Sequence, residues 1–411
     1  MPSAIADVPR ALFVAPESPY PTVGGGAMRS ASLLEYLAPR YRLDCIVFRQ
    51  PGHPDPRTAF PPGLASDILV LDLPYHARDG WRRVWRNTVR LARRVPPLLD
   101  RFAGFGDVVA RYVDGRHYDL ACIEHFWCAP YIDQIGPRAS RTVLDLHNVE
   151  SCWHESAAAA AGRREEAVAH RVFRDASADL ERRLLPRYSL VLATSAADAQ
   201  RALTIAPCTV AVYPNAIPSR PAPVAAEEDV VAFSASFDYE PNRSGVRHFA
   251  RSIWPTLRDR CPGLRWRLIG RNTDAVHRDI ASDPRIECTG PIQDPVAELA
   301  KARVVVVPLL AGSGTRFKII EAWAAARPVV STTLGCEGLP AQDGGNILIE
   351  DDPHRFAEAV LSLLADRGAR ETLGAAGRAT FDREFTWQAA WRILEEELAP
   401  RAVRQSVGTG T

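Results

Sequence analysis

The residues best suited to chemistry lie in one short segment, where two cations and a carboxylate follow a run of small residues. Arg316, Lys318 and Glu321 come soon after the sequence Gly312-Ser313-Gly314-Thr315. An arginine can bind phosphate oxygens with two parallel hydrogen bonds, and a lysine adds a compact point charge. A carboxylate can accept hydrogen bonds from two neighbouring hydroxyls, such as those of a ribose. The segment therefore predicts a site for a nucleotide that carries a diphosphate.

A strand, a loop and a helix must position this segment. The run 304–307 consists of four valines, which is typical of a strand buried in a parallel sheet. Gly312 and Gly314 let the backbone turn tightly and approach a ligand, and Thr315 is predicted to cap the helix that follows. The first amides of a helix favour an anion such as phosphate. Taken alone, Lys318 and Glu321 are also explained as a surface ion pair on one helical face, but the glycine-rich loop favours the binding site.

Short apolar runs alternate with longer helical segments along the chain, which indicates parallel sheets covered by helices on both faces. The predicted strands before the proline-rich stretch are 11–15, 43–48, 68–73, 120–124, 142–146 and 190–193. Those after it are 230–236, 265–270, 285–289, 304–308, 328–331 and 346–349. We therefore predict two doubly wound, Rossmann-like α/β domains, whose ligands bind beyond the carboxyl ends of the strands and in the cleft between the domains.

The predicted domain boundaries follow from the change in composition at residues 214–229, where four prolines and three consecutive acids indicate a linker. The N-terminal domain is predicted over 1–213 and the C-terminal domain over 230–385. A final helix, from about residue 387 to 398, and a tail complete the chain over 386–411.

The overall composition excludes several classes of protein. The 411 residues are 46% apolar and carry a net charge of +1, so nucleic acid is not expected as a partner. No Cys/His cluster has the spacing of a zinc site. The sequence shows no signal peptide and no apolar run near the roughly 20 residues that span a bilayer. We therefore predict a cytoplasmic protein.

The segment 81–102 stands apart because it is strongly basic and amphipathic. It holds one acid, Asp100, and seven arginines: Arg82, Arg83, Arg86, Arg90, Arg93, Arg94 and Arg101. Its apolar and small residues lie at helical spacing on one stripe: Trp81, Val84, Trp85, Thr88, Leu91, Ala92 and Val95. Such a helix can lie on an anionic membrane, here the inner membrane face. The other interpretations are a surface helix that packs its stripe into its own domain, or a wall of an acceptor site.

The run from Gly312 to Leu339, GSGTRFKIIEAWAAARPVVSTTLGCEGL, resembles the donor-binding signature of glycosyltransferase family 4, the group 1 transferases. It is most similar to the branch that reads GxGTRxKxxEAxAxxxPVVST. The resemblance extends through most of the second domain, where residues 212–216 resemble the hinge motif of the family. It implies the GT-B fold, in which two Rossmann-like domains face each other across a cleft and the C-terminal helix returns to the first domain.

The resemblance also implies roles for residues of the second domain. Catalysis is expected to involve Arg316, Lys318 and Glu321, with Glu321 on the ribose. The other residues expected around the donor are Gly314 and Thr315 at the diphosphate, Gly312, Ser313 and Gly314 at the sugar, Gly270, Arg271, Gly290 and Ile292 at the base, and Asp238 and Asn242 in the cleft.

Two motifs of the first domain fit the same family. Gly24 and Gly25, in the turn 21–29, resemble the glycine turn that approaches the donor phosphate or the acceptor, although turns use glycine freely. His147, in the sequence Asp145-Leu146-His147-Asn148, resembles the family histidine that neighbours the transferred sugar and joins the catalytic set. By its position alone, His147 is equally an ordinary polar residue at the end of a strand.

The sequence departs from the family at Ser313. Many members carry two glutamates separated by seven residues; Glu321 would be the second, and Ser313 stands at the first. The donor sugar is therefore left open, and Ser313 with the loop amides is one replacement for the missing carboxylate.

The expected function is transfer of a sugar from a nucleotide-diphosphate donor to a glycan, a lipid-linked sugar or a small molecule, with retention of configuration. No metal or other cofactor is expected, because Arg316 and Lys318 stabilise the leaving diphosphate. The alternatives are a catalytically silent protein that binds a nucleotide sugar or a partner, and a nucleotide-sugar epimerase or hydrolase on the same fold.

Overall fold

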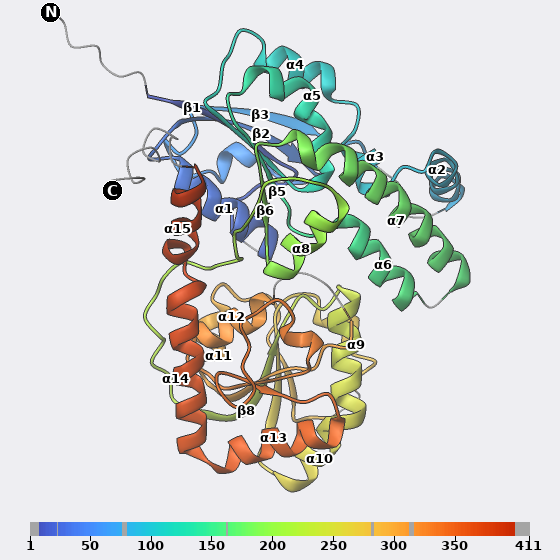
Figure 1. Ribbon diagram of the computed structural model, residues 1–411. Coiled ribbons are helices and arrows are strands. Elements are labelled where there is room, and N and C mark those ends of the chain that lie inside the picture. Colours follow the sequence, from blue (N-terminus) through green and yellow to red (C-terminus); the bar gives the residue numbers. More distant parts are fainter. Residues whose placement is uncertain are drawn as a thin grey trace, which may run out of the picture.

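The structure is a computed structural model that describes residues 8–22, 24–75, 80–161, 163–280, 283–311 and 316–398. Two α/β domains are stacked along the long axis of the molecule, each built around a parallel sheet (Figure 1). This architecture confirms the predicted fold class of two doubly wound domains.

The first sheet contains seven strands within the described residues, all parallel, in the order β3-β2-β1-β4-β5-β6-β7. The strands are β1 (Arg10–Ala15), β2 (Arg42–Arg49), β3 (Asp67–Asp72), β4 (Leu120–Glu124), β5 (Thr142–Asp145), β6 (Leu190–Ala193) and β7 (Val210–Val212). Six of them lie where the apolar runs predicted strands. The seventh, β7, was missed because it is only three residues long and directly precedes the linker.

The second sheet repeats this plan with six parallel strands in the described part of the chain, in the order β10-β9-β8-β11-β12-β13. The strands are β8 (Glu228–Ser234), β9 (Arg265–Ile269), β10 (Ile286–Cys288), β11 (Ala302–Val307), β12 (Val329–Ser331) and β13 (Leu348–Ile349). In both sheets the strand order reverses direction beside the first strand, which is where doubly wound sheets bind ligands.

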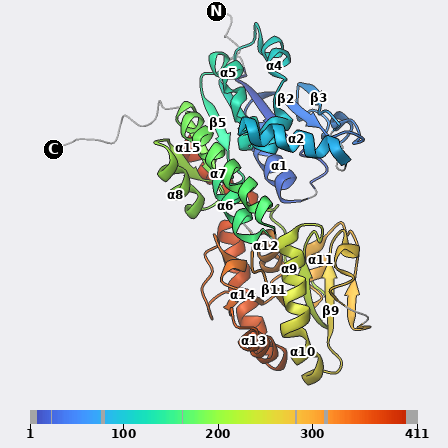
Figure 2. The same ribbon diagram turned by 90° about the vertical axis from the view of Figure 1, so that its right-hand side faces the viewer.

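Helices cover both faces of each sheet (Figures 1 and 2). Those of the first domain are α1 (Gly25–Leu37), α2 (Gly80–Arg93), α3 (Pro97–Phe102), α4 (Gly106–Val113), α5 (Ile132–Ile135), α6 (Glu150–Ala160), α7 (Arg164–Leu184) and α8 (Ala196–Ile205). Those that follow β8 are α9 (Glu240–His248), α10 (Trp254–Arg260), α11 (Pro295–Leu299), α12 (Phe317–Ala324), α13 (Pro353–Ala365), α14 (Arg367–Glu384) and α15 (Trp387–Leu398).

The side chains of β1 show why its sequence is apolar without alternation. Ala11, Phe13 and Ala15 belong to one hydrophobic cluster, whereas Leu12 and Val14 belong to a second cluster on the other face of the sheet. A strand covered on both faces buries every side chain, so continuous apolar runs predict parallel strands of this kind.

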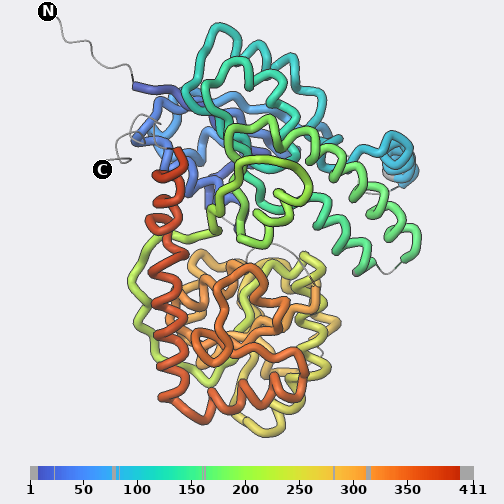
Figure 3. The backbone as a smooth tube through the Cα atoms, in the orientation of Figure 1, coloured from blue at the N-terminus to red at the C-terminus, as the bar shows by residue number. Residues whose placement is uncertain are grey.

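The C-terminal helix crosses from the second domain back to the first (Figure 3). Leu394 and Leu398 of α15 are buried in a hydrophobic cluster of the first domain, and each such leucine contributes about 2 kcal/mol. At the crossing, the two chain segments that connect the domains are hydrogen-bonded to each other. The amide of Ile217 donates to the carbonyl of Phe385 at 3.0 Å, and the amide of Trp387 donates to the carbonyl of Ile217 at 3.0 Å.

The basic segment 81–102 forms two helices, α2 and α3. One of our expectations was that the apolar stripe of this segment packs into its own domain, and α2 has the opposite orientation. A helix that packs its apolar stripe into its own domain would bury Trp81, Val84 and Trp85, but these side chains are 73%, 66% and 65% exposed. Arg90 of the same helix, by contrast, is only 7% exposed. The interpretation as a surface helix that buries its stripe is therefore wrong for Trp81, Val84 and Trp85, whereas Val95 of the same stripe packs against the core. Within the described ranges, no helix is both long and apolar enough to cross a membrane.

Candidate active site

The glycine turn of the first domain meets the second domain at close range. Gly24 precedes α1 with a φ of 95°, a conformation that favours glycine. A Cβ atom placed on Gly25 would lie 2.7 Å from the ring of Phe317, and one placed on Gly24 would lie 4.0 Å from Nη2 of Arg271. The turn between β1 and α1 therefore faces the start of α12 and the end of β9, across the domain boundary.

A buried ion pair between Arg29 and Asp145 holds α1, the helix that follows this turn. The guanidinium of Arg29 binds both carboxylate oxygens of Asp145, with Nε–Oδ2 at 2.7 Å and Nη2–Oδ1 at 2.5 Å, and both side chains are at most 1% exposed. Burial raises the pKa of Asp145, but the charge of Arg29 and the contacts with His147 together outweigh burial, so the pKa lies below its usual range. Arg29 also donates to the carbonyl of Tyr213 at 2.7 Å and to Oδ1 of Asn215 at 3.0 Å. One arginine thus connects α1, the end of β5 and the start of the linker.

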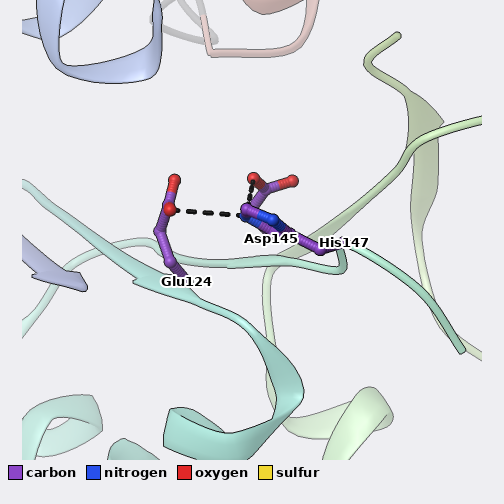
Figure 4. Close-up of side chains that lie close together, drawn as sticks. All are labelled: Glu124, Asp145 and His147. Atoms are coloured by element: carbon purple, nitrogen blue, oxygen red, sulfur yellow. Dashed lines mark ion pairs between the residues drawn. The ribbon is translucent and has the colours of Figure 1, made fainter. Parts of the chain in front are cut away.

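His147 lies beside this pair, just beyond the end of β5. Its Nε2 is 3.4 Å from Oε2 of Glu124 and 3.4 Å from Oδ2 of Asp145 (Figure 4). Its ring also stacks on His125, with centroids 3.5 Å apart. Glu124 and Asp145 end neighbouring parallel strands in register, which brings the two carboxylates together. Burial lowers the pKa of His147, but contacts with these carboxylates raise it overall. Burial raises the pKa of Glu124.

Glu124, Asp145 and His147 could each offer one ligand atom to a metal ion, because these atoms lie within 4.8 Å of one another. Arg29 already occupies both oxygens of Asp145 and holds a positive charge there. A divalent cation would be repelled by that guanidinium. A positively charged imidazole is favoured at this position, because Nε2 of His147 lies 3.4 Å from each carboxylate.

A cavity of about 240 Å³ opens beside His147 and is bordered by both domains. Its lining residues are Leu98, Trp127, His147, Asn148, Glu150, Trp153 and Tyr239. Oε2 of Glu150 accepts hydrogen bonds from Nε1 of Trp127 at 3.1 Å and Nδ2 of Asn148 at 3.3 Å, and burial raises the pKa of Glu150 to about 7. The sequence analysis gave no role to Trp127, Trp153 or Glu150. Their positions in the sequence do not indicate a role, because an aromatic residue that lines a cleft cannot be distinguished from one in a hydrophobic core until the fold is known.

Lys318 and Glu321 lie on α12 beside the end of β8. Oε2 of Glu321 accepts a hydrogen bond from Oγ of Ser234, the last residue of β8, at 3.3 Å, and Nζ of Lys318 lies 6.0 Å from the ring centroid of Phe233. Burial raises the pKa of Glu321 to about 7. Burial, together with the charge of Arg316, lowers the pKa of Lys318 to about 8. Such shifts indicate a cation and an anion held in a poorly solvated position, which is common in binding sites.

Arg316 precedes α12 and is only 4% exposed. Its Nη2 donates to the carbonyl of Leu334 at 3.0 Å and lies 3.8 Å from Oε2 of Glu337. Oε1 of Glu337 in turn lies 3.2 Å from Nη2 of Arg201 in the first domain. Glu337 thus links the expected diphosphate-binding arginine to the opposite domain.

The glycine-rich loop itself, with Gly312, Ser313, Gly314 and Thr315, lies outside the described residues. The helix that follows begins at Phe317, with Arg316 in the cap position. The cap position is therefore occupied by Arg316 and not by Thr315, the residue predicted to cap the helix.

The residues expected at the base and in the cleft are brought together at the carboxyl ends of β8, β9 and β10. Gly270 has a φ of 134°, and a Cβ atom there would lie 2.0 Å from the carbonyl oxygen of Ala235, so only glycine fits. Three hydrogen bonds surround this position, and all of them involve Ser236. Its Oγ accepts from Nε of Arg271 at 2.8 Å and donates to Oδ1 of Asp238 at 2.6 Å. Its carbonyl accepts from Nδ2 of Asn242 at 2.8 Å. Gly290 follows β10 with a φ of 70°, and Ile292 packs partly buried against the core.

Comparisons with known proteins agree with this geometry. Residues 228–366 match the family described as "Glycosyl transferases group 1". No curated protein sequence matches the chain. Sucrose-phosphate synthase from Thermosynechococcus elongatus is similar in structure, with a TM-score of 0.70 and 17% identity over 94% of this chain and 98% of that chain. Alr3699/HepE from Anabaena, in complex with UDP and glucose, has a TM-score of 0.66 and 16% identity over 95% and 99%.

These similarities establish the GT-B fold, which the sequence had predicted. The family match covers residues 228–366, about a third of the chain. That range contains Lys318, Glu321 and the residues gathered at the ends of β8, β9 and β10.

Proposed function

We propose that the chain is a glycosyltransferase that takes a sugar from a nucleotide-diphosphate donor, with retention of configuration. The observation that carries this proposal is the placement of Lys318 and Glu321 on α12, whose first residue, Phe317, lies against the glycine turn at Gly25. The bond between the anomeric carbon and a diphosphate oxygen breaks, and the acceptor oxygen bonds to that carbon on the same face. The acceptor hydroxyl proton leaves with the diphosphate, whose growing charge Arg316 and Lys318 stabilise.

His147 lines the cavity that both domains border, and this position supports a contact with the transferred sugar. We expect no metal requirement, since cations of the protein surround the diphosphate position and Arg29 neutralises Asp145. Full activity in the presence of a chelator would support this expectation, and restoration by an added divalent cation would contradict it.

The decisive experiment is a thermal-shift and donor-hydrolysis screen with UDP, GDP, ADP and dTDP and their common sugars. UDP is the first to test, because the similar HepE structure contains it. Stabilisation by one nucleotide, together with slow hydrolysis of one of its sugars, would identify the donor. Stabilisation without hydrolysis or transfer would favour the silent binding protein, for which the serine at position 313 is the supporting observation. If no nucleotide shifts the melting temperature, the proposal is wrong.

Binding of the nucleoside diphosphate should weaken above pH 8, because the pKa of Lys318 in the ligand-free protein is lowered to about 8. The bound diphosphate favours the charged lysine and raises its pKa. At pH values between the pKa of Lys318 in the free protein and its pKa in the complex, binding is therefore accompanied by uptake of a proton. Affinity then falls by up to about tenfold per pH unit above pH 8. Calorimetric titrations from pH 7 to 10 measure this slope. Lys318→Arg should bind with little dependence on pH, because arginine stays charged, and an equal slope in that variant would refute the assignment.

We also propose that α2 contacts an anionic membrane surface. Its exposed Trp81, Val84 and Trp85 form an apolar face on a helix rich in arginine, which suits the interface of a membrane. The double variant Trp81→Ala/Trp85→Ala should bind vesicles of phosphatidylglycerol about tenfold or more weakly in co-sedimentation. Leu203→Ala, which removes another exposed apolar side chain from α8, is the control. Unchanged vesicle binding by the double variant would exclude this role.

A further inference from the structure

An apolar cavity of about 220 Å³ lies in the first domain, next to the cavity that contains His147. Its walls come from α2, α3, α6 and α7. Leu98, Glu150 and Trp153 line both cavities, so the two spaces adjoin on this side. A ligand that reaches from one cavity into the other is therefore held by the first domain next to the candidate active site.

The wall that α6 and α7 contribute is a cluster of four rings, from Trp153, His154, His170 and Phe173. Trp153 meets His154 and His170 edge to face, with ring centroids 4.8 and 5.7 Å apart. The ring of His154 also lies 5.3 Å from that of His170 and 5.6 Å from that of Phe173. Packed rings of this kind favour an aromatic ligand, because ring pairs attract each other in edge-to-face and offset arrangements.

His154 brings an unsatisfied polar atom to this cavity. The residue is only 3% exposed, and its Nδ1 lies 3.0 Å from Nδ1 of His170. Within the described residues, its Nε2 is buried and has no hydrogen-bond partner. Oε1 of Glu150 lies 4.0 Å from this Nε2, which is beyond hydrogen-bonding distance. A buried polar atom without a partner is unfavourable, so a ligand atom that fills this gap is favoured.

A hydroxyl group fits between Nε2 of His154 and Oε1 of Glu150. An oxygen at about 2.8 Å from each atom completes both hydrogen bonds, because two such bonds together span more than the gap. A hydroxyl donates to the carboxylate and accepts from an N–H of the imidazole. Burial, together with the charge of His170, lowers the pKa of His154 to about 4. The imidazole is therefore neutral at pH 7, and an ion pair with Glu150 does not take the place of this ligand.

The volume of the cavity limits the ligand to about two fused rings. An apolar cavity of about 150 Å³ holds one benzene molecule. The present cavity, at about 220 Å³, has room for a second ring. Asn87 and Glu166 also line it, but both residues are exposed and are therefore hydrated without a ligand. A sugar ring is disfavoured here, because most of its hydroxyls would be buried against apolar side chains.

We propose that the acceptor is an aromatic alcohol whose ring system occupies this cavity and whose hydroxyl lies between Glu150 and His154. The inference rests on the proposed function and adds the class of the acceptor to it. Because Glu150 also lines the cavity of His147, its carboxylate holds the hydroxyl at the border of the space assigned to the transferred sugar. The oxygen of this hydroxyl bonds to the anomeric carbon as the bond to the diphosphate breaks, and its proton leaves with the diphosphate.

Binding is tested by titrating 2-naphthol into the full chain in calorimetry, with and without a saturating nucleoside diphosphate. Ala169→Phe, which fills the cavity from α7, should weaken binding at least tenfold. Val168→Phe is the matched control, because it adds the same ring at a neighbouring position of α7 that is 49% exposed and does not line the cavity. It should change the affinity less than twofold.

A second variant, Leu91→Trp, fills the cavity from α2 and should weaken binding as Ala169→Phe does. Thermal unfolding of both variants shows whether the first domain is intact. Equal affinities of Ala169→Phe, Leu91→Trp and the unmodified chain would overturn the site, as would the absence of binding to the unmodified chain.

Naphthalene and 1-octanol test the two parts of the ligand separately. With its hydroxyl between Glu150 and His154, 2-naphthol should bind at least as tightly as naphthalene, whereas a hydroxyl buried without partners would weaken binding about tenfold or more. The flexible 1-octanol should bind about tenfold more weakly than 2-naphthol, because its chain loses more conformational freedom and makes no ring contacts. Naphthalene that binds tenfold more tightly, or 1-octanol that binds equally well, would contradict the proposal.

Transfer is tested with the donor found in the nucleotide screen, and the 2-naphthyl glycoside is detected by its mass. Ala169→Phe should raise KM for 2-naphthol at least tenfold, and Val168→Phe should leave it within twofold. If the unmodified chain hydrolyses the donor but forms no 2-naphthyl glycoside, the inference about the acceptor is wrong.

Failure of this inference can be distinguished from failure of the proposed function. If no nucleotide binds but 2-naphthol does and Ala169→Phe abolishes this binding, the aromatic site stands and the glycosyltransferase assignment falls. If nucleotide binding and donor hydrolysis are present and 2-naphthol binds equally to the unmodified chain and Ala169→Phe, only the inference about the acceptor is wrong.

Discussion

Replacing Glu321 by glutamine should lower kcat/KM for the donor by about 10- to 150-fold. Hydrogen bonds to a charged acceptor contribute about 1.5–3 kcal/mol, and the variant keeps the shape of the side chain while removing its charge. The carboxylate of Glu321 accepts a hydrogen bond from Ser234 at the end of β8, and under the proposed function its partner in the donor is the ribose diol. Steady-state kinetics with the donor found in the nucleotide screen measure this loss.

A comparison with a dideoxy nucleotide tests the ribose contact directly. If Glu321 binds the 2′ and 3′ hydroxyls, a 2′,3′-dideoxy nucleotide should bind the unmodified chain about as weakly as the full nucleotide binds Glu321→Gln. The two changes should not add when combined. Glu358→Gln, at an exposed glutamate paired with Arg260 in the same domain, is the control and should bind normally. Additive losses would show that Glu321 acts on another part of the donor.

The stability of the Glu321→Gln variant shows whether a loss of activity could instead result from unfolding. The pKa of Glu321 in the folded chain is about 7, above the ordinary value of 4.5, so the unfolded chain loses this proton first as pH rises. Folding stability therefore falls between pH 4.5 and 7, and the full penalty is present above pH 7. Glutamine has no such penalty, so at pH 8 the variant should unfold at the same or a higher denaturant concentration. Loss of activity without loss of stability would then locate the effect in the site.

Replacing Asp145 by asparagine should destabilise the first domain by about 3–5 kcal/mol. The change leaves the buried guanidinium of Arg29 without its carboxylate, and breaking a buried pair in this way is strongly unfavourable. Arg29 also holds the linker through Tyr213 and Asn215, so the loss should loosen the connection to the second domain. Urea unfolding at pH 7, followed by circular dichroism, measures the change.

A surface pair with the same geometry provides the control. Arg49 binds both oxygens of Asp72 at 2.5 and 2.8 Å, but the two side chains are 30% and 65% exposed. Asp72→Asn should therefore shift the unfolding midpoint far less than Asp145→Asn does. The double variant Arg29→Met/Asp145→Leu, which removes both charges, should recover part of the lost stability. Equal effects of Asp145→Asn and Asp72→Asn would show that the buried pair is not important for folding.

The fold could be predicted because its signal is local and repeated. Runs such as 304–307 leave no polar face, and only a parallel sheet covered on both sides accepts such strands in number. The final helix was predicted over the residues it occupies, since Leu394 and Leu398 lie at helical spacing. Strand β7 was missed because three residues before a proline are too few to show a pattern.

The candidate site was predictable only where one segment holds several of its residues. Arg316, Lys318 and Glu321 are close in sequence, so their combination could be recognised before the fold was known. Glu124 and Glu150 were missed, because their proximity to His147 depends on strand register and on a helix start. The orientation of α2 was also missed, since a hydrophobic stripe shows which residues share a face but not which face is turned toward the protein.

The paired crossing at Ile217 restricts how the two domains can move. Both segments that join the domains pass through one place and are bonded to each other there, so relative motion reduces mainly to rotation about an axis near Ile217. The paired segments at Ile217 then act as a fixed hinge, which is the pivot of this rotation. A small rotation at the pivot becomes a larger displacement farther from it, where Tyr239 of the second domain borders the cavity of His147. Binding of a ligand to the second domain can thus change the width of the cavity beside His147 without any rearrangement inside either domain.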